Sequence, residues 1–307
     1  MTNGQSDRMN HLFNLYNQLG AGPMNLSLGL IEGLRERAST ERVFHVVVPD
    51  DGPYARLEPS PGLNLIRLPR WQSVWMKMAY RLYLEYVTLP RLVRRAKVDS
   101  VLAFGNFLLA PVKTGKCVLL HHPYLFDDDL LARLPASARG VERIKRLAFR
   151  LTLRNVDRVV VQSEYVRDRF RAKWPGFRGE VQVLGNPVSG RLRRPGRVEA
   201  EALVARRTEA RDVFTLLYVS RFYPHKNHVF LLSLSQALER KGVRHRILVT
   251  LDARVEGASE LLERVAASGL SIENLGELDQ AALRARYEAA HALIFPSRSE
   301  TFGNPLV

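Results

Sequence analysis

The sequence predicts an α/β protein with two domains, each built on a parallel sheet, and three observations lead to that prediction. Short apolar runs alternate with longer amphipathic stretches, which is the succession of strands and helices that parallel sheets require. A chain of 307 residues is long enough for two domains that each bury a core. A basic and then Ala-, Glu- and Arg-rich stretch interrupts the alternation, so we expect domains at 1–190 and 213–307, with a linker or surface helix at 191–212.

The first domain is expected to contain seven strands, each an apolar run bounded by polar or turn-forming residues. These strands are expected at 9–16, 43–49, 63–68, 98–104, 117–121, 156–161 and 181–184. Amphipathic stretches between most of them predict helices at 24–38, 73–96, 137–153 and 164–173.

The second domain repeats this alternation in a shorter form. Strands are expected at 214–219, 246–251, 272–275 and 292–295, and helices at 227–241, 259–268 and 280–289. Four strands are fewer than a doubly wound sheet normally has, and no helix follows the last of them. We therefore expect the second domain to be incomplete.

The charge of the chain restricts its partners. There are 46 Lys and Arg residues against 31 Asp and Glu, which gives a net charge of +15 and favours nucleic acid, anionic lipid or phosphorylated substrates. No zinc-finger spacing or aromatic RNA-binding signature is present, so we expect no nucleic-acid partner. The alternative is that the surplus arginine reflects only a GC-rich genome. A single cysteine, Cys117, excludes a disulfide framework or a cysteine zinc site within this chain.

Location is predicted from two further features. No apolar run approaches the length of about 20 residues that a bilayer requires, and the polar segment 1–8 lacks the apolar region of a secretory signal. We expect a cytoplasmic protein. The segment 70–84 mixes aromatic residues with cations, as do interfacial helices that contact anionic lipid. The alternative is that Trp71, Trp75 and Tyr83 are core residues of a long helix.

Two segments of the first domain carry candidate site residues. Gly20-Ala-Gly22 joins the first strand to the first helix and can bring backbone amides close to a phosphate, although Asn25 stands where a dinucleotide fingerprint needs a third glycine. The alternative is that the glycines serve only the turn. His121 and His122 follow a strand, where open α/β sheets bind ligands, and imidazole there can contact a sugar or act as a base. Either histidine can instead be structural.

An Asp-rich segment follows the histidines. Asp127-Asp-Asp129 satisfies the D-x-D pattern with which some glycosyltransferases hold a divalent ion. It also precedes the apolar pair Leu130-Leu131, which fits capping of a helix N-terminus. We favour the cap and expect no metal.

The second domain supplies the strongest candidates. Arg221 and Lys226 lie on one predicted strand-to-helix loop, where a planar guanidinium and an ammonium can bind a diphosphate together. Glu300 follows the last predicted strand, and its carboxylate can accept hydrogen bonds from sugar hydroxyls. Gly303, three residues on, lets the backbone come close to a ligand.

These segments resemble those of a known family. Ser220-Arg-Phe-Tyr-Pro-His-Lys-Asn227 is similar to the G-R-x-x-x-x-K-N segment of family 4 glycosyltransferases, retaining enzymes of the GT-B architecture with two Rossmann-like domains. Ser220 replaces the usual glycine. The segments 287–297 and 300–305 resemble the helix, strand and E-x7-E site that follow in this family. The second glutamate of that site would fall one position beyond Val307, so we expect a truncated C-terminus.

The resemblance implies a hexosyltransferase that uses a nucleotide-sugar donor and a saccharide or lipid-linked acceptor, with no cofactor and no metal. It implies a role in polysaccharide biosynthesis and a peripheral position at the inner face of the membrane. The implied site residues are Arg221, Lys226 and Gly22 for the donor diphosphate, Phe302, Gly303 and Asn304 for the donor sugar, and Glu300, His121 and His122 for catalysis. Two alternatives remain at this point: a non-catalytic remnant of such an enzyme, or a Rossmann-type NAD(P) dehydrogenase.

Overall fold

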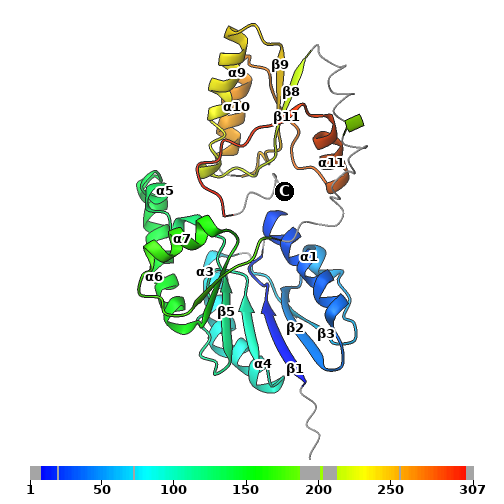
Figure 1. Ribbon diagram of the computed structural model, residues 1–307, viewed down its shortest axis with the longest axis vertical. Helices are drawn as coiled ribbons and strands as arrows, with labels where there is room; N and C mark the ends of the chain where they lie inside the picture. The colour runs from blue at the N-terminus through cyan, green and yellow to red at the C-terminus, as the bar shows by residue number, and fades with distance from the viewer. Residues whose placement is uncertain are drawn as a thin grey trace, which may run out of the picture. The chain divides into compact units, whose positions relative to one another are not determined.

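The computed structural model describes residues 8–18, 21–71, 73–186, 201–202, 213–255 and 257–301. The chain divides into two compact units, Met1–Pro187 and Val188–Val307, each of which is an α/β structure (Figure 1). The predicted linker at 191–212 lies outside the described residues, except for residues 201–202, which are helical. The predicted class, two Rossmann-like units with parallel sheets, is confirmed.

The first unit is built on a seven-stranded sheet in the order β3-β2-β1-β4-β5-β6-β7, in which every neighbouring pair is parallel. Its strands are β1 (Met9–Asn14), β2 (Arg42–Pro49), β3 (Leu63–Leu68), β4 (Ser100–Ala103), β5 (Gly115–Leu119), β6 (Arg158–Val161) and β7 (Glu180–Val183). The chain builds outward from β1 to β3 and then returns to the other side of β1. This order places a topological switch point between β1 and β4, at whose carboxyl end such sheets bind ligands.

Helices cover both faces of this sheet. They are α1 (Ala21–Arg37), α2 (Gly52–Ala55), α3 (Val74–Tyr83), α4 (Leu89–Arg95), α5 (Asp128–Ala132), α6 (Ala136–Asn155) and α7 (Glu164–Lys173), with a 3-10 turn at Pro123–Leu125. The short helix α2 was not predicted, because four residues are too few to show a helical period. The N-terminus of α5 was predicted only through its capping residue, Asp127.

A π-helical turn, Leu84–Thr88, separates α3 from α4, so the prediction of one uninterrupted helix at 73–96 is wrong in this detail. Pro90 lies just beyond the turn and has no N–H to donate to the carbonyl of Tyr86, which removes one α-helical hydrogen bond there. The turn widens where that bond is missing.

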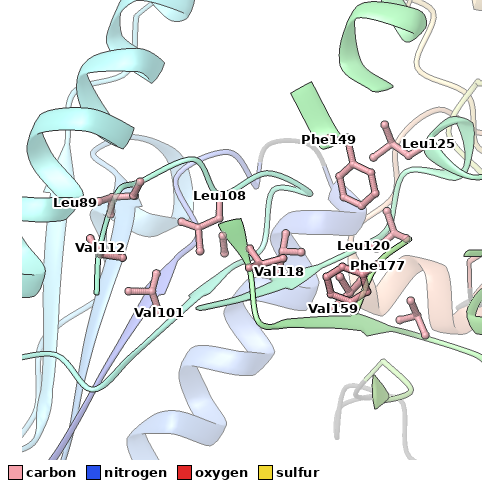
Figure 2. Packing of buried hydrophobic residues seen from close by; sticks show 14 of the residues in the cluster. Leu89, Val101, Leu108, Val112, Val118, Leu120, Leu125, Phe149, Val159 and Phe177 are labelled. Atoms are coloured by element: carbon pink, nitrogen blue, oxygen red, sulfur yellow. The ribbon is translucent and has the colours of Figure 1, made fainter. Parts of the chain in front are cut away.

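Alternate side chains of the strands feed two cores, one on each face of the sheet. On β2, Val47 belongs to one core while Val46 and Val48 belong to the other. The first core includes Leu89 of α4 and Phe149 of α6, both shown in Figure 2. The helices α4, α6 and α7 therefore share one face, and α1 and α2 cover the opposite one.

The second unit has a four-stranded parallel sheet in the order β10-β9-β8-β11 among the described residues. Its elements are β8 (Phe214–Tyr218), α9 (Phe230–Arg240), β9 (His245–Val249), α10 (Ala258–Ser268), β10 (Ile272–Asn274), α11 (Gln280–Ala289) and β11 (Ala292–Leu293), with a 3-10 turn at Pro224–Lys226. The last strand is shorter than the predicted 292–295, because only Ala292 and Leu293 pair with β8 before the chain enters a loop.

The aromatic segment at 70–84 is only partly packed. Trp75 is 78% exposed and Tyr83 is 48% exposed, so the alternative that both are core residues is wrong. Trp71 is half-buried against Tyr80. Among the helices that the structure describes, none combines the length and the apolarity needed to span a bilayer.

Candidate active site

Two loops of the second unit meet at the carboxyl edge of its sheet, because β8 and β11 are neighbouring parallel strands. One loop runs from β8 to α9 and the other follows β11. The backbone N–H of Arg298 donates to the carbonyl of His225 at 2.8 Å. The side-chain amide of Asn227 donates to the carbonyl of Pro296 at 3.2 Å. These bonds fix the two loops against each other.

A buried tyrosine supports the same junction from below. The hydroxyl of Tyr218, at the end of β8, donates to the carbonyl of Lys226 at 2.7 Å and lies 3.2 Å from the Ser297 hydroxyl. Asn227 adopts a left-handed conformation with φ 55°, which lets the chain turn out of the 3-10 segment directly after Lys226. The backbone around Lys226 is therefore held by hydrogen bonds from Tyr218 at the end of β8 and from Asn227 to the loop after β11.

Lys226 and Glu300 form an ion pair at this junction, with side chains 17% and 20% exposed. The two residues lie 74 positions apart in the sequence, and the structure brings them together as the predicted site requires. A partly buried pair of this kind is screened less by water than a surface pair. Each group is also reachable from solvent, so a ligand can compete with one partner for the other.

Arg221 lies on the same loop as Lys226 and is exposed. Within the described part of the chain it makes no ion pair, and its guanidinium is free to bind a phosphate bidentately. The loop between Arg221 and α9 is packed by aromatic rings. His228 is 2% exposed and lies 4.8 Å from Tyr218 and 5.5 Å from Phe222, measured between ring centroids.

The role of His228 was not predicted. Burial lowers its pKa to about 4, so the imidazole is neutral at pH 7 and acts as a packing residue beneath the loop. Gly257 serves the same packing, since its φ is 79° and a Cβ there would lie 2.7 Å from the Phe222 ring. No local pattern in the sequence marks either residue, because both act through partners brought close by the fold.

Three predicted donor-sugar contacts, Phe302, Gly303 and Asn304, lie outside the described residues and stay predictions. Gly22 is described and lies in the first turn of α1, so the prediction that it belongs to a loop before the helix is wrong. The helix begins at Ala21 because Pro23 is compatible with a first turn. A Cβ on Gly22 would meet no atom within 4 Å, so the space beside it is open.

The first unit separates its two adjacent histidines into different environments. Nε2 of His121 lies 2.9 Å from the carbonyl oxygen of Phe104, and Nδ1 lies 2.9 Å from the side-chain amide nitrogen of Gln162. Because a carbonyl only accepts, Nε2 carries the proton and Nδ1 accepts from Gln162. Burial lowers the pKa of His121 and keeps it neutral. Both ring nitrogens are thus occupied by the protein.

His122 is more open, and its side chain is 28% exposed. Its Nε2 lies 2.7 Å from Oε2 of Glu142 on α6, whose other oxygen accepts from Lys145 at 2.6 Å. Burial raises the pKa of Glu142, but the hydrogen bonds from His122 and Lys145 and the positive charge of Lys145 outweigh it and hold that pKa below its usual range. With Nε2 donating to Glu142, Nδ1 of His122 is left as an acceptor.

Asn106 fixes the backbone beside both histidines. Its side-chain oxygen accepts from the backbone N–H of His121 at 2.7 Å and of His122 at 3.0 Å. Its φ of 64° places it in the left-handed region, where asparagine is tolerated. Neither Glu142 nor Asn106 was predicted, since each acts through a contact that only the folded chain creates.

The Asp-rich segment is structural. The side chain of Asp127 accepts from the N–H of Leu130 at 2.9 Å and caps α5, as predicted. Asp128 pairs with Arg146 and Lys173, which lowers its pKa. In the part of the chain that the structure describes, no group of three or more His, Cys, Asp or Glu side chains is arranged to hold a metal ion.

Two family models match the sequence. The model described as Glycosyltransferase Family 4 matches residues 29–189, and the model described as Glycosyl transferases group 1 matches residues 201–307. Comparison with curated proteins gives no significant match.

Solved structures share the fold at low sequence identity. Sucrose-phosphate synthase from Thermosynechococcus elongatus is 17% identical with a TM-score of 0.68, and covers 96% of this chain and 77% of its own. HepE from Anabaena, solved with UDP and glucose, is 16% identical with a TM-score of 0.63, over 97% and 77% of the two chains. WaaG, a glycosyltransferase involved in lipopolysaccharide biosynthesis, is 13% identical with a TM-score of 0.61, over 96% and 77%.

Proposed function

The chain belongs to glycosyltransferase family 4, and on that premise we propose that it transfers a hexose from a nucleotide-sugar donor with retention and without a metal ion. The observation that carries the proposal is the Lys226–Glu300 pair, held at the carboxyl edge of the second sheet by two cross-linked loops. The family assignment favours a glycosyltransferase over the alternative of an NAD(P) dehydrogenase.

Lys226 and Arg221 are the proposed partners of the donor diphosphate. The glycosidic bond between the anomeric carbon and the diphosphate oxygen breaks during transfer, and negative charge develops on that oxygen. Two cations on this loop stabilise this charge most at the transition state, which is the role that a divalent ion plays in other transferases. The carboxylates of Asp127 and Asp128 are engaged in a helix cap and in ion pairs, which supports a reaction without a metal.

Glu300 is the proposed partner of the donor sugar. When the diphosphate binds Lys226, the carboxylate of Glu300 loses its only described ion-pair partner and can accept hydrogen bonds from sugar hydroxyls. Donor binding therefore exchanges one ion pair within the protein for two contacts with the ligand. Phe302, Gly303 and Asn304 follow directly in the sequence and are proposed to line the sugar.

His122 and not His121 is the proposed acceptor-side residue of the first unit. Both nitrogens of His121 are used within the fold, while Nδ1 of His122 can accept a hydrogen bond from a hydroxyl of the acceptor. Glu142 holds the ring of His122 in this orientation. In the proposed reaction the proton of the acceptor hydroxyl passes to the departing diphosphate oxygen. His122 therefore orients this hydroxyl and does not have to take up its proton.

The donor and acceptor are proposed by class. UDP and glucose accompany HepE and so make UDP-glucose the first donor to test here. We propose a saccharide or lipid-linked acceptor and work at the inner face of a membrane in polysaccharide biosynthesis. The net charge of +15 and the exposed aromatic residues at 75–86 support the membrane part of this proposal.

Isothermal titration of the chain with UDP-glucose, GDP-mannose and NADP tests the donor class. We expect binding of a nucleotide-sugar, weakened at least tenfold by Arg221→Ala because a charge-assisted phosphate contact is lost. The exposed Arg240→Ala on α9 is the matched control. Binding of NADP but of no nucleotide-sugar would overturn the proposal.

A further inference from the structure

Helix α6 carries a stripe of large apolar side chains that face away from the sheet. Val141, Ile144, Leu147 and Leu151 are 53%, 70%, 61% and 47% exposed. Their spacing of three or four residues places them along one side of the helix. The other side is already packed, since Phe149 is fully buried in the core shown in Figure 2. The helix is therefore apolar on two sides, of which the described residues cover only one.

Cations follow one border of this stripe. Arg143, Arg150 and Arg154 are exposed, and within the described residues none of the three makes an ion pair. The only acid of α6 is Glu142, which is buried on the packed side. An apolar face with a positive border and no acid is the composition of helices that lie in the headgroup region of a bilayer.

A second exposed apolar face lies on α3 and on the π-helical turn after it. Trp75, Met78, Leu82, Tyr83 and Tyr86 are 78%, 55%, 51%, 48% and 53% exposed. The helix α3 contains Lys77 and Arg81 but no acid. Tryptophan and tyrosine are the residues enriched where protein meets lipid headgroups, because each joins an apolar ring to a polar atom.

Phe107 connects α3 and α6 on one side of the sheet. The guanidinium of Arg81, on α3, lies 5.1 Å from the centre of the Phe107 ring, and Phe149, on α6, packs edge-on against the same ring at 6.2 Å. Leu84 and Phe149 also belong to one core. The helices α3 and α6 therefore lie on the same side of the sheet, with Phe107 between them.

We propose that these outward faces form one surface that docks on a bilayer containing anionic lipid. We call it the α3–α6 surface, defined by Trp75, Met78, Leu82, Tyr83, Tyr86, Val141, Arg143, Ile144, Leu147, Arg150, Leu151 and Arg154. The inference rests on the proposed membrane partner and assigns it to particular residues. Pairing of two copies of the surface would place like charges together. A nucleic acid would pair with the cations but leave the apolar stripe uncovered. A bilayer with anionic lipid covers the apolar stripe and also pairs with its positively charged border.

Co-sedimentation of the 307-residue chain with vesicles tests the charged border. Binding is measured on vesicles of phosphatidylglycerol and phosphatidylcholine, and on phosphatidylcholine alone. The triple variant Arg143→Gln, Arg150→Gln, Arg154→Gln is compared with Arg240→Gln, Lys241→Gln, Arg264→Gln, which removes the same charge from the second unit. Each cation near an anionic surface contributes about a fivefold factor, so we expect the first variant to bind roughly 100-fold more weakly and the second to stay near wild type.

The apolar stripe is tested with Ile144→Ser, Leu147→Ser against Val243→Ser, an exposed apolar residue of the second unit. We expect the stripe variant to lose at least tenfold in vesicle binding, because two apolar side chains no longer enter the interface. Thermal unfolding of every variant checks that the chain is folded.

Three outcomes would overturn the inference. The first is that wild type does not bind anionic vesicles, and the second is that both triple variants lose binding alike. The third is a wild-type dimer, seen by analytical ultracentrifugation, that the stripe variant abolishes, because the surface would then join two copies of the chain. Titration of UDP-glucose on the same samples separates this result from the proposed reaction, since donor binding needs no vesicle.

Discussion

The two units place a carboxylate and a cation at the carboxyl end of their sheets, but they hold them differently. In the second unit, Lys226 and Glu300 have only each other as ion-pair partners in the described part of the chain. In the first unit, Glu142 is bound at both oxygens, by His122 and by Lys145. A ligand can replace either Lys226 or Glu300 in their ion pair. Glu142, in contrast, stays bound if either His122 or Lys145 moves away. An exchangeable charge suits binding, and a doubly held charge suits positioning.

The largest expected effect is on the exchangeable pair. Lys226→Ala removes a cation that stabilises the departing diphosphate, and turnover of the sugar donor should fall on the order of 10²-fold or more. Single-turnover kinetics with UDP-glucose measure this loss. The matched control is Lys241→Ala, an exposed lysine at the end of α9. Near-normal turnover of Lys226→Ala would refute the leaving-group role.

A smaller effect is expected at the doubly held carboxylate. Glu142→Gln keeps an oxygen that can accept from His122 but removes the charge that pairs with Lys145, and kcat/KM for the acceptor should fall roughly tenfold. Donor affinity should not change. Glu239→Gln, at an exposed position on α9, is the control. If donor affinity and acceptor kinetics fell together, Glu142 would support the fold and not the orientation of His122.

The pKa of Glu142 also predicts how stability depends on pH. A carboxyl whose folded pKa lies below its unfolded value stabilises the fold above that value, and this contribution is lost as the pH falls through the folded pKa. The difference in unfolding free energy between wild type and Glu142→Gln should therefore be constant near neutrality and shrink below pH 4.5, the ordinary value. Urea unfolding from pH 7 to pH 3 measures it, and a difference that grows in acid would contradict the assignment.

The two neighbouring histidines should divide between stability and activity. His121→Gln loses buried hydrogen bonds and should lower the unfolding free energy by about 1–3 kcal/mol, with little change in acceptor kinetics. His122→Gln should lower kcat/KM with a smaller change in stability, because its ring is more exposed. Parallel chemical unfolding and steady-state kinetics separate the two variants. The reverse result would exchange their roles.

The smallest effect is expected at the Asp-rich segment. Asp127→Ala removes the cap of α5 and should cost about 1 kcal/mol of stability, while the activity of both proteins should be unaffected by EDTA. Thermal unfolding and an activity assay with EDTA measure the two quantities. Loss of wild-type activity in EDTA would show that a metal takes part.

Much of the fold follows from the sequence because its signals are local. The strand at 63–68 and the helix at 164–173 were predicted at their observed bounds, since each has a clear apolar run or a capped amphipathic period. The π-helical turn at Leu84–Thr88 was missed, because the pattern of apolar residues continues through it.

The candidate site was predictable where one loop carries its own signal. Arg221 and Lys226 lie five residues apart in one segment, and Glu300 directly follows an apolar run. Glu142 and Asn106 gave no such signal. Each reaches His122 from a different element, 20 and 16 residues away in the chain, and only the packed sheet and α6 bring them to it.

The π-helical turn determines how α3 is rotated about its own axis relative to α4. A turn with one extra residue rotates everything before it by about 100° relative to an uninterrupted α-helix. Deleting a single residue such as Val87 would remove the extra residue of this turn without changing any side chain of α3. The aromatic side chains at 75–83 would then point in a new direction while α4 kept its place. The number of residues in this one turn therefore determines the direction in which the side chains of α3 point.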